Sequence, residues 1–195
     1  MLINNQKRTI VHLFKDFTTI HTITSIAKEL NLSRVGIWKI IAELTTIKYI
    51  TAKKLGTGKT STEIIQLQWN PILERAMALY LTEEAWVQSR WCNTFKEYEK
   101  NADFLIIYGS ILHNPKQADD IDILGISKNF DKIDTITNKT QQTQIKKIHS
   151  IWFTEKELEI ELKKPNKAMI DAVKTGIVLF GIDNYIKFMK KNQRT

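Results

Sequence analysis

Residues 104–124 read FLIIYGSILHNPKQADDIDIL. The segment Phe104–Tyr108 is a short, unbroken apolar run, which is typical of a buried β-strand. It ends at Gly109-Ser110, and nine residues later the segment Asp120–Leu124 forms a second apolar strand that is interrupted by carboxylates. Carboxylates in an otherwise buried strand are costly unless they are paired or bound to a cation. The pattern therefore predicts two buried strands that carry a polar site.

The carboxylates of this second strand, Asp120 and Asp122, are separated by one residue. Because side chains alternate along a strand, we expect both on the same face, with Cα atoms roughly 6.5 Å apart. Such a pair suits one or two hard cations, and Mg²⁺ prefers one or two carboxylates together with phosphate oxygens. We therefore predict that Asp120 and Asp122 are catalytic residues that bind Mg²⁺ or Mn²⁺.

The dipeptide Gly109-Ser110 follows the first buried strand. A glycine at this position lets the backbone turn sharply and approach a ligand closely. Backbone N–H groups at the start of the next element, together with the Ser110 hydroxyl, are suited to hold phosphate oxygens. We therefore predict that Gly109 and Ser110 bind phosphate beside the metal site.

Tyr108-Gly109-Ser110 and the segment Asp119–Leu124 together resemble the signature of minimal nucleotidyltransferases in the DNA polymerase beta superfamily. That signature is an apolar residue, Gly-Ser, a loop of about ten residues and Asp-x-Asp between apolar residues. The resemblance covers roughly residues 100–185. The segment Thr175–Gly181 also resembles the closing segment of small archaeal members that carry an N-terminal winged helix.

This resemblance implies a mixed sheet with flanking helices, in which Gly109 and Ser110 hold the phosphates of a nucleoside triphosphate. It also implies Mg²⁺-dependent transfer of a nucleoside monophosphate to a hydroxyl group on a protein, an RNA or a small molecule. A second function stays open, because the chain could be a catalytically weak or inactive transcriptional regulator that senses nucleotide or acts as an antitoxin.

The chain departs from the family pattern in two places. The family often has a small residue and an arginine soon after Gly-Ser, where this chain has Leu112 and His113. Active members also carry a third carboxylate on a later strand, and the candidate strand here, residues 146–153, has none. His149 in that strand either faces the site and accepts a proton or is an ordinary, partly buried histidine, and we prefer the second interpretation. Glu155 is assigned to the first turn of a helix over residues 154–163.

The first third of the chain predicts three helices followed by a hairpin. Apolar residues at helical spacing indicate helices over residues 4–17, 24–30 and 33–44. Asn31 is suited to the left-handed conformation of the tight turn between the last two, which predicts a helix-turn-helix. The β-rich runs 49–55 and 62–69 flank residues 56–60, whose glycines are typical of a hairpin turn.

Three helices and a hairpin with a basic tip resemble bacterial and archaeal winged helix-turn-helix regulators, over about residues 5–69. In such domains the second helix of the motif enters the major groove of duplex DNA. The residues expected to face DNA are Ser33, Arg34, Val35, Trp38 and Lys39 on that helix, with Lys53, Lys54 and Lys59 on the wing.

The charge distribution favours a nucleic-acid partner for this part of the chain. The net charge is +8, and residues 1–70, with ten Lys or Arg and four Asp or Glu, contribute +6 of it. A merely solvated, lysine-rich surface and a protein-docking role are the alternatives that stay open. A domain with a single recognition helix usually binds DNA with high affinity only as a dimer, so the chain could also form a homodimer.

A length of 195 residues suggests two compact units in an α+β chain. We expect a winged helix-turn-helix domain at 1–69, a helical connector at 70–100 and a nucleotidyltransferase-like domain at 101–195. Within the connector, helices are expected over 71–81 and from Thr82 onward. Its aromatic residues are interpreted as packing between the domains rather than as a platform for bases.

The apolar runs and the cysteine content of the sequence indicate where in the cell the protein is found. The apolar run at 104–108 is far shorter than the ~18 residues that a membrane span needs, so no membrane partner is expected. One cysteine, Cys92, forms no internal disulfide and no cysteine-based zinc site. We therefore expect a cytoplasmic protein.

Overall fold

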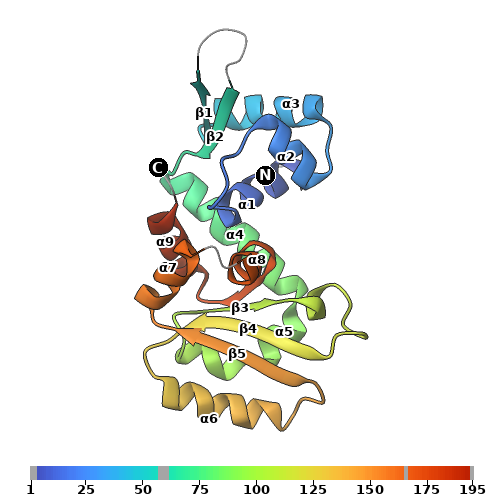
Figure 1. Ribbon diagram of the computed structural model, residues 1–195, viewed down its shortest axis with the longest axis vertical. Helices are drawn as coiled ribbons and strands as arrows, with labels where there is room; N and C mark the ends of the chain where they lie inside the picture. Colours follow the sequence, from blue (N-terminus) through green and yellow to red (C-terminus); the bar gives the residue numbers. More distant parts are fainter. Residues whose placement is uncertain (1–3, 57–61, 165–166, 194–195) are drawn as a thin grey trace. The chain divides into compact units, whose positions relative to one another are not determined.

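The computed structural model describes residues 4–56, 62–164 and 167–193 (Figure 1). Within these residues the chain is α+β, as predicted, with a two-stranded and a four-stranded sheet. It divides into two compact units, Met1–Tyr80 and Leu81–Gln193, which we call the first and second units. No helix in the described part of the chain is long and apolar enough to cross a membrane.

The first unit begins with three helices, α1 (Asn4–Lys15), α2 (Ile23–Leu30) and α3 (Arg34–Thr46). Local sequence explains their bounds. The Thr22 side chain caps α2 through a capping box, and the Ser33 hydroxyl accepts a hydrogen bond from the Gly36 N–H at the start of α3. Asn31 ends α2 in the left-handed conformation, with φ 53°, as the helix-turn-helix pattern predicts.

A two-stranded antiparallel hairpin follows, formed by β1 (Ile50–Leu55) and β2 (Thr62–Leu67). Ile50 and Ile65 are buried and join the apolar faces of the three helices. The core of this unit consists mainly of Ile10, Leu13, Phe14, Ile26, Ile37, Ile41, Leu44, Ile50 and Ile65. The predicted site residue Lys59 lies outside the described residues.

Helix α4 (Pro71–Val87) is longer than the sequence pattern indicated. It begins as expected, because the Asn70 side chain accepts hydrogen bonds from the N–H groups of Ile72 and Leu73. It does not restart at Thr82, since buried Leu81 and Ala85 continue its apolar face and no helix breaker intervenes. The chain then forms α5 (Ser89–Thr94) and the 3-10 helix η2 (Lys96–Lys100).

The second unit is built on a four-stranded sheet in the order β5-β4-β3-β6. Its strands are β3 (Phe104–Tyr108), β4 (Asp120–Ile126), β5 (Lys147–Phe153) and β6 (Ile177–Phe180). Strand β3 pairs antiparallel with both β4 and β6, whereas β4 pairs parallel with β5. The two apolar runs at 104–108 and from 120 onward therefore belong to one sheet, as predicted.

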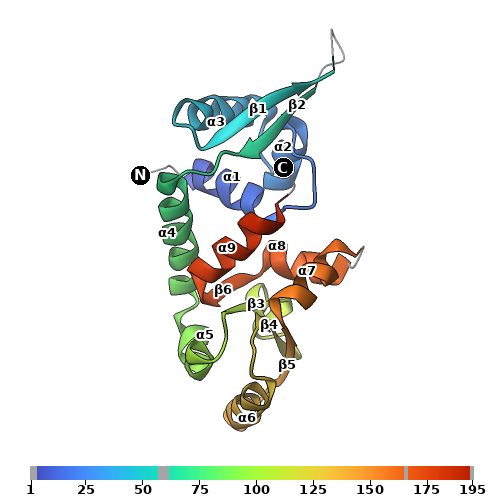
Figure 2. The same cartoon turned by 90° about the vertical axis from the view of Figure 1, so that its left-hand side faces the viewer.

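Helices pack on both faces of this sheet (Figure 2). One face contributes Leu105, Ile107, Ile121, Ile123, Ile148 and Leu179 to a core shared with α5, η2 and α6 (Phe130–Gln141). Phe104 points to the other face, where its ring contacts Tyr185 and Phe188 of α9 (Ile182–Asn192). The remaining helices are α7 (Glu155–Lys163) and α8 (Lys167–Thr175).

Most of the aromatic rings of residues 86–98 are buried within the second unit. Trp91, Phe95 and Tyr98 belong to its core, and Tyr98 stacks on Trp152 of β5 with ring centroids 5.5 Å apart. Trp86 differs, with 79% of its surface exposed. The buried rings therefore pack within the core of the second unit, which differs from the interpretation that they pack between the domains, and they are not accessible to stack with bases.

Candidate functional site

Asp120 and Asp122 lie on the same face of β4, on either side of the buried Ile121. In the parallel pairing with β5, His149 lies directly opposite Asp122. Its Nδ1 atom is 3.0 Å from Asp120 Oδ2 and 3.7 Å from Asp122 Oδ1. One ligand-type atom from each of the three residues lies within 4.8 Å of the others. The fold thus brings together two carboxylates and an imidazole.

The position of His149 differs from the preferred sequence-based interpretation. Its side chain is 46% exposed and faces the carboxylates, whereas its neighbour Ile148 turns into the core. The reason is the register between β4 and β5, which sets residue 149 opposite residue 122. His149 therefore occupies the site and is not an ordinary core histidine.

Gly109 comes very close to one of the carboxylates. It has φ +82°, and a Cβ atom built on it would lie 2.4 Å from Asp122 Oδ2. A side chain at this position would thus both strain the backbone and displace the carboxylate. The 3-10 helix η3 (Ser110–Leu112) follows, and Ser110 is exposed at its start. Gly109 therefore borders the Asp122 carboxylate, Ser110 follows it directly in the chain, and His113, one residue beyond η3, is exposed.

The electrostatic environment favours a cation. Burial, and then the neighbouring Asp120 carboxylate, raise the pKa of Asp122, and the facing His149 opposes that rise. Burial also raises the pKa of Tyr108, and the negative charges of Asp122 and Asp120 raise it further. A divalent cation beside these carboxylates would relieve the repulsion that disfavours the ionised form of Asp122.

Tyr108 and Lys147 are two site neighbours whose placement sequence reasoning missed. Tyr108 lies opposite Asp122 in the antiparallel pairing, and Lys147 lies opposite Asp120 in the parallel pairing. Lys147 is exposed and adds a positive charge at the edge of the site. The signal for both is strand register, which depends on how the strands pair and not on residue type.

The three facing side chains fit a divalent metal. Asp120 and Asp122 supply the oxygen donors that Mg²⁺ prefers, with coordination positions left for phosphate oxygens. His149 would add an imidazole nitrogen, a donor that first-row transition metals bind more readily than Mg²⁺ does. The set therefore suits Mg²⁺ or Mn²⁺ through its two carboxylates.

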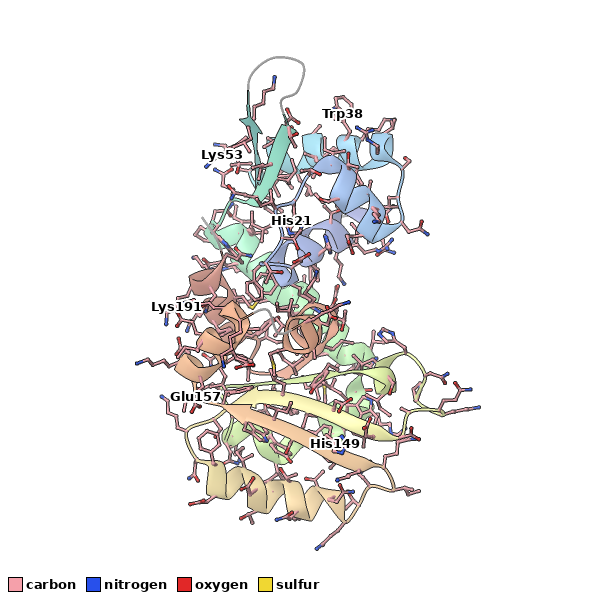
Figure 3. The ribbon with its side chains drawn as sticks, in the orientation of Figure 1. His21, Trp38, Lys53, His149, Glu157 and Lys191 are labelled. Carbon is pink, nitrogen blue, oxygen red and sulfur yellow. The ribbon has the colours of Figure 1, made fainter. Side chains whose placement is uncertain are left out.

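The exposed face of α3 carries the residues expected to meet DNA. Ser33, Arg34, Val35, Trp38 and Lys39 are all exposed. Val35 and Trp38 are 65% and 57% exposed, whereas Ile37, between them, is fully buried. Lys53 and Lys54 are exposed on β1, and Trp38 and Lys53 extend into solvent in Figure 3. The first unit thus presents a basic surface with two large apolar side chains.

Comparisons of the chain with protein-family models, with curated proteins and with solved structures found no match. Function is therefore inferred from the two surfaces just described. These are the Asp120-Asp122-His149 cluster with Gly109 beside it and the basic face of α3.

Proposed function

We propose that the second unit is a nucleotidyltransferase and that the first unit is a winged helix that binds duplex DNA. The observation that carries the proposal is the cluster of Asp120, Asp122 and His149 beside the close backbone approach of Gly109. Carboxylates on a strand next to a Gly-Ser turn are suited to a cation with phosphate oxygens beside it, which supports the proposal. The same residues carry the sequence resemblance to minimal nucleotidyltransferases.

The proposed reaction transfers a nucleoside monophosphate from a nucleoside triphosphate. The oxygen of an acceptor hydroxyl forms a bond to the α-phosphorus, and the bond from that phosphorus to the bridging oxygen of the β-phosphate breaks. The products are the nucleotidylated acceptor and pyrophosphate. Gly109 and Ser110 hold and orient the β- and γ-phosphates, so catalysis is largely positioning and charge neutralisation.

Asp120 and Asp122 would hold the divalent cation. When bound, Mg²⁺ or Mn²⁺ neutralises charge on the triphosphate and on the leaving pyrophosphate.

His149 is suited to accept the proton of the acceptor hydroxyl. Its Nδ1 lies 3.0 Å from Asp120 Oδ2, and a carboxylate oxygen only accepts, so Nδ1 is the protonated nitrogen in this contact. In the neutral imidazole Nε2 then keeps its lone pair, which is the arrangement of a general base oriented by a carboxylate.

The DNA-binding part of the proposal rests on the exposed basic face of α3 and on the lysines of β1. Arg34 and Lys39 project from the second helix of the helix-turn-helix, and Lys53 and Lys54 lie on the strand that begins the hairpin. Helices of this kind enter the major groove, while the hairpin contacts phosphates.

A regulator that binds nucleotide without turnover is the second candidate function. The observation that favours it is that an imidazole, and not a carboxylate, faces Asp120 and Asp122 from β5. In the family that the sequence resembles, active members carry a third carboxylate on a later strand. A site that lacks it would hold a nucleotide and a cation more readily than it would transfer the nucleotide.

The decisive experiment incubates the full-length protein with Mg²⁺ or Mn²⁺ and each of four labelled nucleoside triphosphates. We expect release of pyrophosphate and transfer of label to protein or RNA. The matched control is Asp122→Asn, which keeps the shape of the side chain and should abolish both signals. A nucleotide-dependent rise in melting temperature without pyrophosphate release would support the regulator. If the protein shows neither nucleotide binding nor turnover, both functions proposed for the second unit are overturned.

A further inference from the structure

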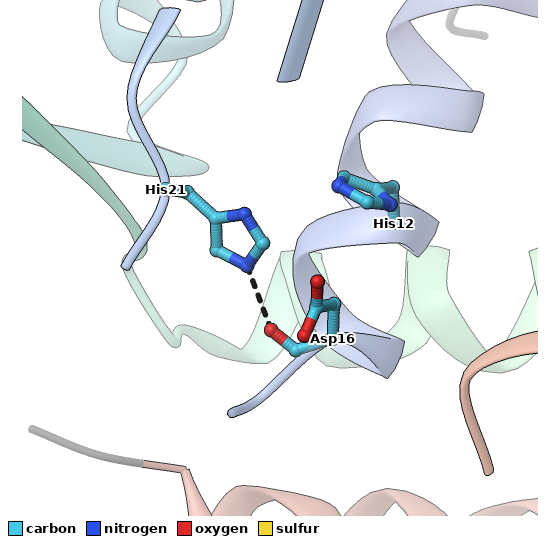
Figure 4. A group of neighbouring side chains, drawn as sticks. All are labelled: His12, Asp16 and His21. Carbon is cyan, nitrogen blue, oxygen red and sulfur yellow. Dashed lines mark hydrogen bonds between the residues drawn. The ribbon is translucent and has the colours of Figure 1, made fainter. Parts of the chain in front are cut away.

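A second cluster of ligand-type side chains lies in the first unit, and the proposed function does not use it. His12 and Asp16 lie one helical turn apart at the end of α1, where the Asp16 N–H donates to the His12 carbonyl oxygen at 2.9 Å. His21 reaches the same place from the segment that follows (Figure 4). One ligand-type atom from each of the three residues lies within 4.8 Å of the others.

The cluster is shielded from solvent. Asp16 and His21 are only 3% and 6% exposed, and the Nε2 atom of His12 is buried. The rings of His12 and His21 meet edge to face, with centroids 5.2 Å apart. Two histidines and a carboxylate gathered in a buried place are a costly arrangement for a core, and they are also the donor set of many transition-metal sites.

Hydrogen bonds hold the donors in position. His21 Nε2 lies 2.7 Å from the Asp16 carbonyl oxygen, which only accepts, so Nε2 carries the proton and Nδ1 keeps its lone pair. Metal-binding histidines commonly donate their other N–H to a backbone carbonyl in this way. Asp16 Oδ1 accepts hydrogen bonds from the hydroxyls of Thr18 and Thr19, which orient the carboxylate.

We propose that His12, Asp16 and His21 bind a divalent transition-metal ion of the Zn²⁺ or Co²⁺ type. Imidazole nitrogens favour such ions over Mg²⁺, which prefers oxygen donors. Zinc–ligand distances are roughly 2.0–2.2 Å, so the three ligand atoms, which lie within 4.8 Å of one another, would move closer together around one ion, with water as a fourth ligand. This site is separate from the cluster at Asp120 and goes beyond the proposed function.

The site joins α1 to the wing. The His21 carbonyl accepts a hydrogen bond from the Ile65 N–H at 2.8 Å, which pairs the segment of His21 with β2. An ion held by His12, Asp16 and His21 would fasten the end of α1 to the strand that returns from the hairpin. Metal occupancy would therefore stabilise the fold of the DNA-binding unit.

The test titrates Co²⁺ into full-length protein carrying Asp122→Asn and His149→Gln, which removes the other candidate metal cluster. We expect one equivalent of Co²⁺ to bind, with a visible absorption band that Zn²⁺ displaces, and a rise in melting temperature. Adding His12→Gln should weaken binding about tenfold or more. The control, His113→Gln, removes an exposed histidine and should leave binding unchanged.

Asp16→Asn provides a second ligand variant if His12→Gln fails to fold, and circular dichroism of the metal-free proteins verifies that each is folded. Absence of Co²⁺ binding in the parent of this series would overturn the site. Equal binding by the parent and by both folded ligand variants would overturn it as well. Neither result would bear on the nucleotidyltransferase, because the cluster at Asp120 is already removed in every protein compared.

Discussion

Gly109 is the residue at which the backbone most directly shapes the candidate site. We expect Gly109→Ala to abolish the nucleotide-dependent rise in melting temperature, because its Cβ would lie 2.4 Å from Asp122 Oδ2 at φ +82°. The strained backbone should also lower the free energy of unfolding by about 1–3 kcal/mol. Denaturant unfolding and thermal melts measure both effects. Ser110→Ala, at an exposed position without that strain, should change stability by less than about 0.5 kcal/mol.

The ionisation of Asp122 makes the stability of the protein depend on pH. Its pKa is raised above the ordinary value of 3.8, so the folded protein holds the proton more tightly than the unfolded chain does. Stability from this group is therefore complete below pH 3.8 and is lost as the pH rises through the raised pKa. We expect metal-free Asp122→Asn to be at least as stable as the parent at pH 7, with the difference closing toward acid pH. Unfolding curves that show a clear loss of stability at pH 7 would contradict this account.

His149 separates the two candidate functions. We expect His149→Asp, which supplies a carboxylate opposite Asp122 but removes the imidazole proposed to accept the proton, to lower Mg²⁺-dependent pyrophosphate release about 100-fold. Steady-state assays with Mg²⁺ and with Mn²⁺ measure the change, and His149→Gln is the neutral control. A higher rate in His149→Asp would contradict the role of the imidazole and would mean that the site works better with a third carboxylate, because Mg²⁺ prefers oxygen donors.

At the level of elements, the exposed face of α3 should determine DNA binding. Arg34→Ala and Lys39→Ala should each weaken binding of duplex DNA. Each should also reduce the slope of log K against log salt concentration by about one, which is the contribution of one phosphate contact. Fluorescence anisotropy between about 50 and 200 mM salt measures both quantities. Lys156→Ala, on α7 of the second unit, should change neither. Binding by the parent that does not respond to salt would contradict the interpretation of α3.

Elements with local signals could be predicted from the sequence, and those that depend on pairing could not. Asn31 marks the end of a helix through its own backbone preference, and the structure confirms it. The run at Thr82 looked like a helix start, but buried packing on both sides of it keeps α4 continuous. His149 faces Asp122 because of the register between β4 and β5, and no local sequence pattern determines that register.

For the whole molecule, composition and the change of pattern along the chain were enough to predict an α+β protein with two compact units. The alternation of β4 likewise predicted that Asp120 and Asp122 share a face. The cluster of His12, Asp16 and His21 escaped prediction, because His12 and Asp16 come from the end of a helix and His21 from an irregular segment. His12 and Asp16 have helical spacing, but tertiary packing brings His21 to them, and that contact leaves no spacing signature for sequence reasoning to detect.

The division into two units also predicts that the two proposed activities are separable. Arg34 belongs to the first unit and Asp122 to the second, and changes at independent sites add in free energy to within roughly 0.3–0.5 kcal/mol. We therefore expect Arg34→Ala to weaken DNA binding equally in the parent and in the Asp122→Asn protein. The metal- and nucleotide-dependent thermal shift should likewise be the same with and without Arg34→Ala.

A double-mutant cycle measured with both readouts tests this expectation. DNA affinity is determined for the parent, the two single variants and the double variant, each with and without Mg²⁺ and nucleoside triphosphate. A coupling energy larger than about 0.5 kcal/mol that appears only when nucleotide is present would mean that the second unit controls the first. Since an enzyme merely attached to a DNA-binding domain needs no such coupling, that result would favour the nucleotide-sensing regulator, whereas additivity favours an enzyme that the winged helix brings to DNA.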